Sequence, residues 1–226
     1  MANKTNIRRL AKILSLTTLS NKNFELKELN VSNLDYLEYI LEQEMAARRN
    51  NRVLRNRRSS GLPDLTFDIA ALNDGLKYQV ERLSELKRIE SSTNLLVTGT
   101  CGIGKTALVT HLACLALEKE YKVLYLTQDE LLTAHRNKSE IAGARAVIDK
   151  ANKADLIIVD DFLYLTPGIE ELDELYRVLL SLNKGASLTF ISNRDISDWI
   201  ATAPDKYNMQ LLIDRILAKA EVLKLY

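Results

Sequence analysis

Residues 99–106 of this 226-residue chain match the phosphate-binding pattern G-x-x-x-x-G-K-[ST] without a gap. The apolar run 94–98 before them predicts a short buried strand, and residues 107–117 after them predict a helix. In this order, backbone N–H groups of the loop can point at a phosphate, with the positive end of the helix dipole beneath it. A glycine-rich turn with an exposed lysine is the alternative, but the strand and helix around the motif favour a phosphate loop.

The side chains of this loop suit a nucleoside triphosphate. Lys105 is placed to bridge the β- and γ-phosphates, and the hydroxyl of Thr106 can complete a magnesium shell. Two cysteines are too few for a disulfide framework, and two histidines do not indicate a zinc cluster. From the loop alone we therefore expect a nucleoside triphosphate bound with Mg²⁺, and the family resemblance described below implies that this nucleotide is ATP. The expected binding residues are Gly99, Thr100, Cys101, Gly102, Ile103, Gly104, Lys105, Thr106 and Ala107.

A second apolar run, residues 156–159, ends in two carboxylates, Asp160 and Asp161. Ligands of open α/β sheets bind at the carboxyl ends of the strands. Asp160 is therefore a candidate to hold the magnesium ion through water, as a Walker B aspartate does, and Asp161 to align the attacking water or accept its proton. A strand that ends in two solvated acids is the alternative, and the preceding phosphate loop favours the functional interpretation.

A third apolar run, residues 187–191, leads into Ser192, Asn193 and Arg194. A polar side chain at the end of a neighbouring strand can contact the γ-phosphate or the attacking water, so Asn193 is a candidate catalytic sensor. Serine and asparagine are also favoured at turns and helix caps, which is the alternative interpretation.

Short apolar runs alternate with helical patterns beyond residue 61, which is typical of a parallel sheet covered by helices on both faces. We expect strands at 94–98, 122–126, 156–159, 187–191 and 221–226. We expect helices at 70–89, 107–117, 128–135, 139–151, 170–182 and 208–219. The sequence thus predicts an α/β fold with a central parallel sheet.

The first 60 residues read as a separate helical unit. The pair Ser32 and Asp35 gives a capping signal, and the apolar spacing after it predicts a long helix over residues 32–56. Residues 4–20 predict one or two short helices. Serine, glycine and proline at 59–63 break the long helix. We therefore expect a helical N-terminal domain, residues 1–60, and an α/β domain, residues 61–226.

Charge is unevenly distributed between these two parts. Residues 1–60 hold 12 Lys and Arg against 6 Asp and Glu, whereas the whole chain has a net charge of +1. A basic helical segment favours an anionic partner. The candidate DNA-binding residues are Arg48, Arg49, Arg52, Arg55, Arg57 and Arg58. A solvated helix end whose arginines pair with acids of the same chain is the alternative.

The composition is ordinary for a soluble globular protein, with 46% hydrophobic and 27% charged residues. No apolar run approaches the roughly 20 residues of a membrane helix, and the N-terminus lacks the apolar core of a signal peptide. We expect a cytoplasmic protein with no membrane partner.

The phosphate loop, the apolar strand ending in two aspartates, residues 190–199 and residues 211–215 together resemble the IstB-like AAA+ ATPases, the helper proteins of insertion-sequence transposases. Residues 36–49 and the basic run after them extend the resemblance. It implies an ATPase that assembles on double-stranded DNA without sequence preference, as an ATP-dependent homo-oligomer that recruits a transposase. It also implies that Arg215 acts as an arginine finger on a neighbouring subunit, where an intramolecular ion pair is the alternative.

The chain departs from this family's pattern in two places. Asp161 is a shorter acid than the Glu that many members carry, and Phe162 and Leu163 stand where a glycine often follows the acidic pair. Only 11 residues follow Arg215, so we expect no C-terminal helical lid. Such a site would be open and dependent on a neighbouring subunit.

Three other functions use the same motifs. A DnaC-like loader of a replicative helicase shares the resemblance, but its N-terminal part would dock a helicase. A metabolic P-loop kinase needs a second phosphate site, and no cluster of arginines inside the α/β part indicates one. The third is an ATP-binding module that no longer hydrolyses ATP. Subunit number, DNA preference and the identity of the transposase do not follow from the sequence.

Overall fold

The computed structural model describes residues 4–21, 33–182 and 185–225. The chain divides into two compact units, one up to Arg55 and one from Asn56 onward. The elements of the first part are α1 (Lys4–Ile13), α2 (Thr17–Ser20) and α3 (Asn33–Ser59), and α3 runs past the division. The structure confirms helices in both expected places, and α3 continues three residues beyond the expected end. The expected cap at Ser32 lies outside the described residues.

Glu44 organises the first unit. This buried carboxylate accepts hydrogen bonds from the backbone N–H groups of Thr17 and Thr18, at 2.9 and 2.8 Å, and so caps the start of α2. The Arg48 Nε atom donates to the same carboxylate at 2.8 Å. Burial alone would raise the pKa of Glu44, but the hydrogen bonds from Thr18, Arg48 and Thr17 lower it to about 2. A single ionised side chain therefore joins α2 to α3.

The second unit is built on a five-stranded parallel sheet, which confirms the predicted α/β architecture. The strands are β1 (Asn94–Gly99), β2 (Val123–Thr127), β3 (Leu156–Asp160), β4 (Ser187–Ser192) and β5 (Ala220–Leu225). They pair in the order β2-β3-β4-β1-β5, with Thr127 opposite Asp160 and Thr98 opposite Ser192. All five carboxyl ends therefore meet at one edge, the edge at which open α/β sheets bind ligands.

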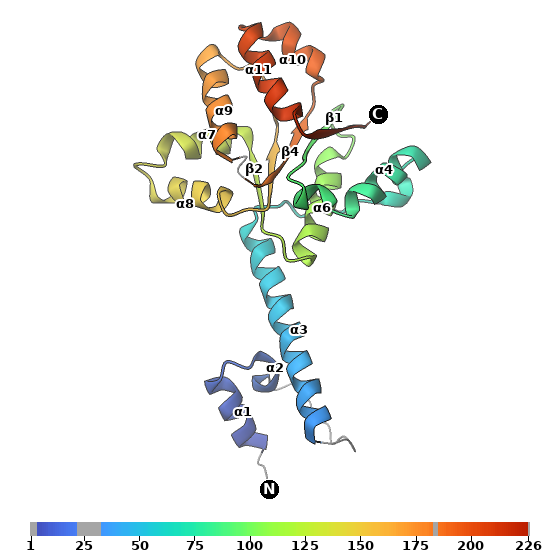
Figure 1. The fold of residues 1–226 in the computed structure, drawn as a ribbon, viewed down its shortest axis with the longest axis vertical. Coiled ribbons are helices and arrows are strands. Elements are labelled where there is room, and N and C mark those ends of the chain that lie inside the picture. Colours follow the sequence, from blue (N-terminus) through green and yellow to red (C-terminus); the bar gives the residue numbers. More distant parts are fainter. Residues whose placement is uncertain (1–3, 22–32, 183–184, 226) are drawn as a thin grey trace. The chain divides into compact units, whose positions relative to one another are not determined.

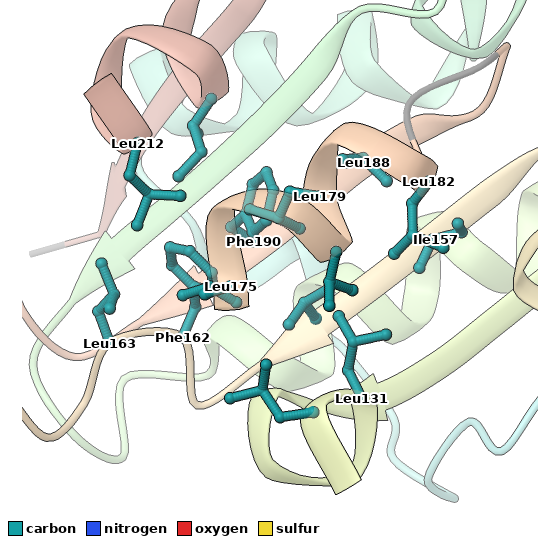
Figure 2. Packing of buried hydrophobic residues seen from close by; sticks show 14 of the residues in the cluster. Leu131, Ile157, Phe162, Leu163, Leu175, Leu179, Leu182, Leu188, Phe190 and Leu212 are labelled. Carbon is teal, nitrogen blue, oxygen red and sulfur yellow. The ribbon is translucent and has the colours of Figure 1, made fainter. Parts of the chain in front are cut away.

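Helices cover both faces of this sheet (Figure 1). Beyond β1 they are α6 (Lys105–Glu118), α7 (Gln128–Asn137), α8 (Ala142–Ala151), α9 (Ile169–Leu182), α10 (Ile196–Thr202) and α11 (Lys206–Leu217). Helix α6 lies on one side, and α7, α9 and α11 lie on the other. On that second side, Ile157 and Phe190 of the sheet pack with Leu175 and Leu212 of the helices (Figure 2). The apolar strands are thus buried on both faces, as a parallel sheet requires.

Two stretches differ from the sequence-based expectation. The helix expected at 70–89 is divided into η1 (Ile69–Ala71), α4 (Asp74–Ser84) and α5 (Lys87–Glu90). Leu86 causes the second break, because its left-handed φ of 64° ends the helical path, and burial of its side chain holds it there. Helix α10, capped by Asp195, was not predicted. Within the three described ranges, no helix combines the length and apolarity needed to cross a bilayer.

Candidate nucleotide-binding site

The loop between β1 and α6 has the backbone of a phosphate cradle. Gly99 has a φ of 152°, and a Cβ there would lie 2.5 Å from the carbonyl oxygen of Leu225, so the close pairing with β5 requires glycine. Gly102 and Gly104 also have positive φ, of 80° and 96°, and a Cβ at either would meet nothing within 4 Å. The loop therefore curls around open space rather than around a side chain.

The backbone donors of this loop have no partner in the part of the chain that the structure describes. Among the described residues, the backbone N–H groups of residues 101–104 make no backbone hydrogen bond, and Gly104 caps α6 without a side-chain contact. The first N–H groups of α6 lack helical partners by construction. Thr100, Cys101 and Ile103 are exposed, and Ala107 is half-buried. An anion at the start of α6 would find these donors and the positive end of the helix dipole.

Lys105 is folded back onto the loop. Its Nζ atom donates to the carbonyl oxygens of Gly99 and Thr100, at 2.9 and 2.7 Å, and its side chain is buried. Burial lowers the pKa of Lys105, and the negative charges of Asp160 and Asp161 oppose that shift. The ammonium group is thus held at the mouth of the cradle, from which it can turn to a bound phosphate.

Asp160, the last residue of β3, is the acid that the structure brings to the loop. Its Oδ2 atom accepts a hydrogen bond of 2.9 Å from the hydroxyl of Thr106, and its Oδ1 atom one of 2.7 Å from the N–H of Asp161. The side chain is buried, so the carboxylate is held in one orientation. A hydroxyl and a carboxylate oxygen in contact are ligands of the kind that Mg²⁺ takes in proteins, directly or through water. Thr106 and Asp160 therefore fit a magnesium ion bound together with a nucleotide.

Tyr125 of β2 is a third member of this cluster, and the sequence analysis missed it. Its hydroxyl donates to Asp160 Oδ2 at 2.6 Å. Burial, followed by the hydrogen bond to Asp160, raises the pKa of Tyr125 well above its usual value, so the hydroxyl stays protonated and donates. The sequence did contain a signal: Tyr125 is a hydroxyl-bearing side chain in an apolar strand. It lies two residues before Thr127, the residue that pairs with Asp160, and so on the same face of the sheet.

Asp161 and Leu163 lie on a tight loop after β3. Both have left-handed backbones, with φ of 52° and 50°. The loop is fixed by hydrogen bonds from the N–H of Phe162 to the Ile191 carbonyl, 2.8 Å, and from the N–H of Leu163 to Gln128 Oε1, 2.9 Å. The carboxylate of Asp161 is exposed on this frame. Partial burial and the nearby charges of Asp160 and Asp129 raise the pKa of Asp161, against the opposing effect of Lys105.

The structure does not join Asn193 or Arg215 to this cluster. Asn193 is exposed just beyond β4, and no hydrogen bond links it to the loop among the described residues. The next residue, Arg194, instead ties the strand end to neighbouring segments, donating to the carbonyl oxygens of Leu163 and Asp198. Arg215 is half-buried on α11, and its Nε atom has no hydrogen-bond partner in the described parts of the chain. An intersubunit role for Arg215 stays a prediction.

The six candidate DNA-binding arginines differ in their surroundings. Arg48 is paired with Glu44 and also donates to the Ser15 carbonyl oxygen. Arg57 is half-buried and donates to the carbonyl oxygens of Leu62 and Pro63, at 2.7 and 2.8 Å. These two guanidinium groups therefore hold protein contacts. The side chains of the other four are exposed: Arg49, Arg52, Arg55 and Arg58. The Arg55 Nε atom also donates to the Asn51 carbonyl oxygen of its own helix at 3.4 Å.

Comparison with known proteins finds relatives whose names describe ATP-binding proteins of insertion sequences. The chain is 27% identical over 205 residues to an insertion sequence IS21-like ATP-binding protein of Bacteroides fragilis, covering 89% of this chain and 78% of that one. It is 26% identical over 208 residues to an insertion sequence IS21 ATP-binding protein of Pseudomonas aeruginosa, covering 88% and 76%.

Solved structures share the fold. The crystal structure of DnaI matches with a TM-score of 0.58 at 18% identity, over 72% of this chain and 92% of DnaI. The DnaC helicase loader matches with a TM-score of 0.57 at 12% identity, over 76% of this chain and 99% of DnaC. The fold is therefore an AAA+ type of P-loop fold. A family model described as "IstB-like ATP binding protein" matches residues 6–226, so the chain belongs to the IstB-like ATP-binding family.

Proposed function

We propose that this protein is a transposition helper that binds ATP with Mg²⁺, assembles on DNA and recruits a transposase. The observation that carries the proposal is the contact between Thr106 and Asp160 beside a loop of unpaired N–H groups, because this arrangement fits the phosphates and the metal ion of a bound nucleotide. The insertion-sequence names of the relatives give the biological setting.

Nucleotide binding uses groups that are already in place. The N–H groups of the loop and of the first turn of α6 donate hydrogen bonds to the phosphate oxygens, and Lys105 turns from the Gly99 and Thr100 carbonyls to the same phosphates. Magnesium, when bound, neutralises charge on the phosphates, and Thr106 and Asp160 are the residues that would hold it.

Hydrolysis requires a group that aligns water, and Asp161 is the candidate. Its carboxylate is exposed beside Asp160, and its pKa is raised, so it is a better proton acceptor than an ordinary surface aspartate. Asn193 is a second candidate for contact with the water or the γ-phosphate. We assign ATP hydrolysis to this chain on these grounds.

Arg215 is assigned to a site on a neighbouring subunit. Arg215 is only half-buried on α11, so its guanidinium group can meet a charged partner from outside the subunit, and a γ-phosphate held by the next subunit would supply one. ATP occupancy would then control assembly. The exposed arginines of α3 would supply a basic surface for DNA phosphates, bound without regard to sequence.

A helicase loader is the second candidate function, since DnaI and DnaC share the fold. At 18% and 12% identity this likeness concerns the fold alone, whereas the relatives at 26–27% identity are insertion-sequence proteins. We therefore favour transposition. The protein then acts in the cytoplasm, on chromosomal or element DNA.

Subunit mixing tests this function. Sedimentation with duplex DNA should give large complexes with a non-hydrolysable ATP analogue and none with ADP. Arg215→Ala should bind ATP but form no such complexes, whereas Arg177→Ala, which removes a solvent-exposed arginine from α9, should assemble normally. Mixed Arg215→Ala and Lys105→Ala subunits should recover part of the DNA-stimulated hydrolysis. The proposal would be contradicted if the complexes formed equally with the ATP analogue and with ADP. It would also be contradicted if no mixing ratio restored DNA-stimulated hydrolysis.

A further inference from the structure

Tyr125 makes two contacts of different kinds. Its hydroxyl donates to Asp160 Oδ2 at 2.6 Å, on the same oxygen that accepts from Thr106. Its backbone N–H donates to the carbonyl oxygen of Ser60 at 2.7 Å. Ser60 directly follows α3, which ends at Ser59. One residue of β2 thus touches both the acid of the candidate metal site and the segment that follows the basic helix.

The reach from Tyr125 to Asp160 follows from the strand register. Tyr125 is opposite Ile158 of β3, and Asp160 is two residues further along the same face. Such a diagonal neighbour on the next strand lies about 7–8 Å away, within the reach of an aromatic side chain. A phenylalanine would fill the same space without the hydroxyl, so the contact depends on tyrosine.

The backbone of Tyr125 is closely packed against residues 60–62. Gly61 has a φ of 76°, and a Cβ there would lie 2.7 Å from the Tyr125 carbonyl oxygen. Ser60 is fully buried, and its hydroxyl donates to the Arg57 carbonyl oxygen at 2.7 Å. The Arg57 side chain in turn binds the Leu62 carbonyl oxygen. Residues 57–62 therefore form a fixed turn that cannot shift without displacing Tyr125.

We propose that Tyr125 is a positioning residue that orients Asp160 for Mg²⁺ and couples that orientation to the turn at residues 57–62. This inference rests on the proposed nucleotide and magnesium site. Thr106, Tyr125 and the N–H of Asp161 together give the carboxylate three donors. Loss of the tyrosine hydroxyl removes one of the two donors that hold Oδ2, which weakens the hold on the carboxylate, and displacement of the turn moves the hydroxyl away from it.

Binding of a fluorescent ATP analogue, titrated with Mg²⁺ and repeated in EDTA, tests the first half. Tyr125→Phe should raise the Mg²⁺ concentration for half-maximal binding by about tenfold, the effect of one hydrogen bond to a charged group. Its affinity in EDTA should equal that of the parent protein. The matched control is Tyr121→Phe, which removes a tyrosine hydroxyl bound to the Glu90 carboxylate far from Asp160. That control should leave the Mg²⁺ titration unchanged.

Gly61→Ala tests the coupling. The added methyl group displaces the turn from Tyr125 and should raise the Mg²⁺ requirement in the parent protein. In the Tyr125→Phe background, the same substitution should have no further effect, because the hydroxyl that transmits the displacement is already absent. Circular dichroism of the parent protein, the two single variants and the double variant checks that a changed Mg²⁺ requirement does not come from loss of the fold.

The outcomes are distinguishable. A parent protein whose nucleotide affinity ignores Mg²⁺ would overturn the proposed metal site, and the role of Tyr125 with it. A parent protein that responds to Mg²⁺, with Tyr125→Phe responding identically, would overturn only the positioning role. Additive effects of Gly61→Ala and Tyr125→Phe would overturn the coupling.

Discussion

The hydroxyl of Thr106 donates a hydrogen bond of 2.9 Å to the carboxylate of Asp160 and so joins the first turn of α6 to the end of β3. These residues are 54 positions apart, and the parallel register brings them to one edge of the sheet. The contact is made with two groups of the kind that bind magnesium.

Asp161→Asn should separate nucleotide binding from turnover. The substitution removes the proton acceptor, and asparagine tolerates the left-handed backbone that Asp161 adopts. Hydrolysis should fall by about 10²–10⁴-fold, the usual contribution of a general base, while ATP binding is retained. Undiminished release of phosphate in a single-turnover assay would show that another group aligns the water.

The fall in the rate of ATP hydrolysis at low pH (the acid limb of the pH–rate profile) should depend on the charge of Asp129. The pKa of Asp161 is raised by burial, Asp160 and Asp129, so hydrolysis should fall as the pH drops through this raised value, which lies above 3.8. Asp129→Asn removes one of the repelling charges and should move the acid limb to lower pH with little change in the maximal rate. An acid limb that does not move would exclude Asp161 as the titrating group.

At Leu163, the glycine variant should be more stable than the alanine variant, which reverses the usual order. The residue is fully buried yet has a φ of 50°, so packing of the leucine offsets a strained backbone. Leu163→Ala loses the packing and keeps the strain, whereas Leu163→Gly loses the packing and relieves it. Urea unfolding should show the glycine variant to be more stable by about 1 kcal/mol.

Leu175 is the matched control for this comparison, because it is equally buried but lies within α9. There alanine should be more stable than glycine by about 1 kcal/mol, following helix propensity. The same order at both positions would contradict the assigned backbone strain.

Glu44 should stabilise the start of α2 in a pH-dependent way. Its pKa is lowered from 4.5 to about 2, so its stabilising effect is fully present above pH 4.5 and is lost as the pH falls from 4.5 towards 2. Glu44→Gln should reduce hydrogen-exchange protection of the Thr17 and Thr18 amides at pH 6, by about 1 kcal/mol for a lost cap. The difference should be much smaller at pH 2, where about half of the Glu44 carboxylate is protonated, and Glu42→Gln, an exposed control, should show none at either pH. An equal loss at both pH values would refute the ionic cap.

Charge reversal at Arg52 and Arg55 should weaken binding to duplex DNA of any sequence. Each phosphate contact that is lost should reduce the slope of log affinity against log salt by about one. Arg145→Glu combined with Lys150→Glu, a double reversal at exposed positions of α8, changes the overall charge by the same amount and is the control. Arg57→Ala should act differently, because it removes the carbonyl contacts of Leu62 and Pro63 and so lowers stability. DNA affinity that is unaffected by the double reversal would rule out this surface.

The sequence predicted the sheet and its edge well, because those rest on patterns that are local or periodic. The phosphate loop and the apolar strand ending in Asp160 are contiguous, and parallel strands bring such ends together. The contact of Tyr125 with Asp160 was not predicted, because it depends on how β2 and β3 pair, and neither strand's sequence alone determines that register. The left-handed conformations of Leu86 and Leu163 were not predicted either, because leucine by itself disfavours them and only tertiary packing holds these residues there.

The central claim is that this loop binds ATP, and calorimetric titration of the full chain with ATP and Mg²⁺ tests it most directly. Lys105→Ala removes a charge-assisted contact and should weaken binding by about 1.5–3 kcal/mol. Lys138→Ala, which removes an exposed lysine just after α7, should bind as the parent protein does. Equal affinity of Lys105→Ala and the parent protein, with both folded, would contradict the assignment of the site.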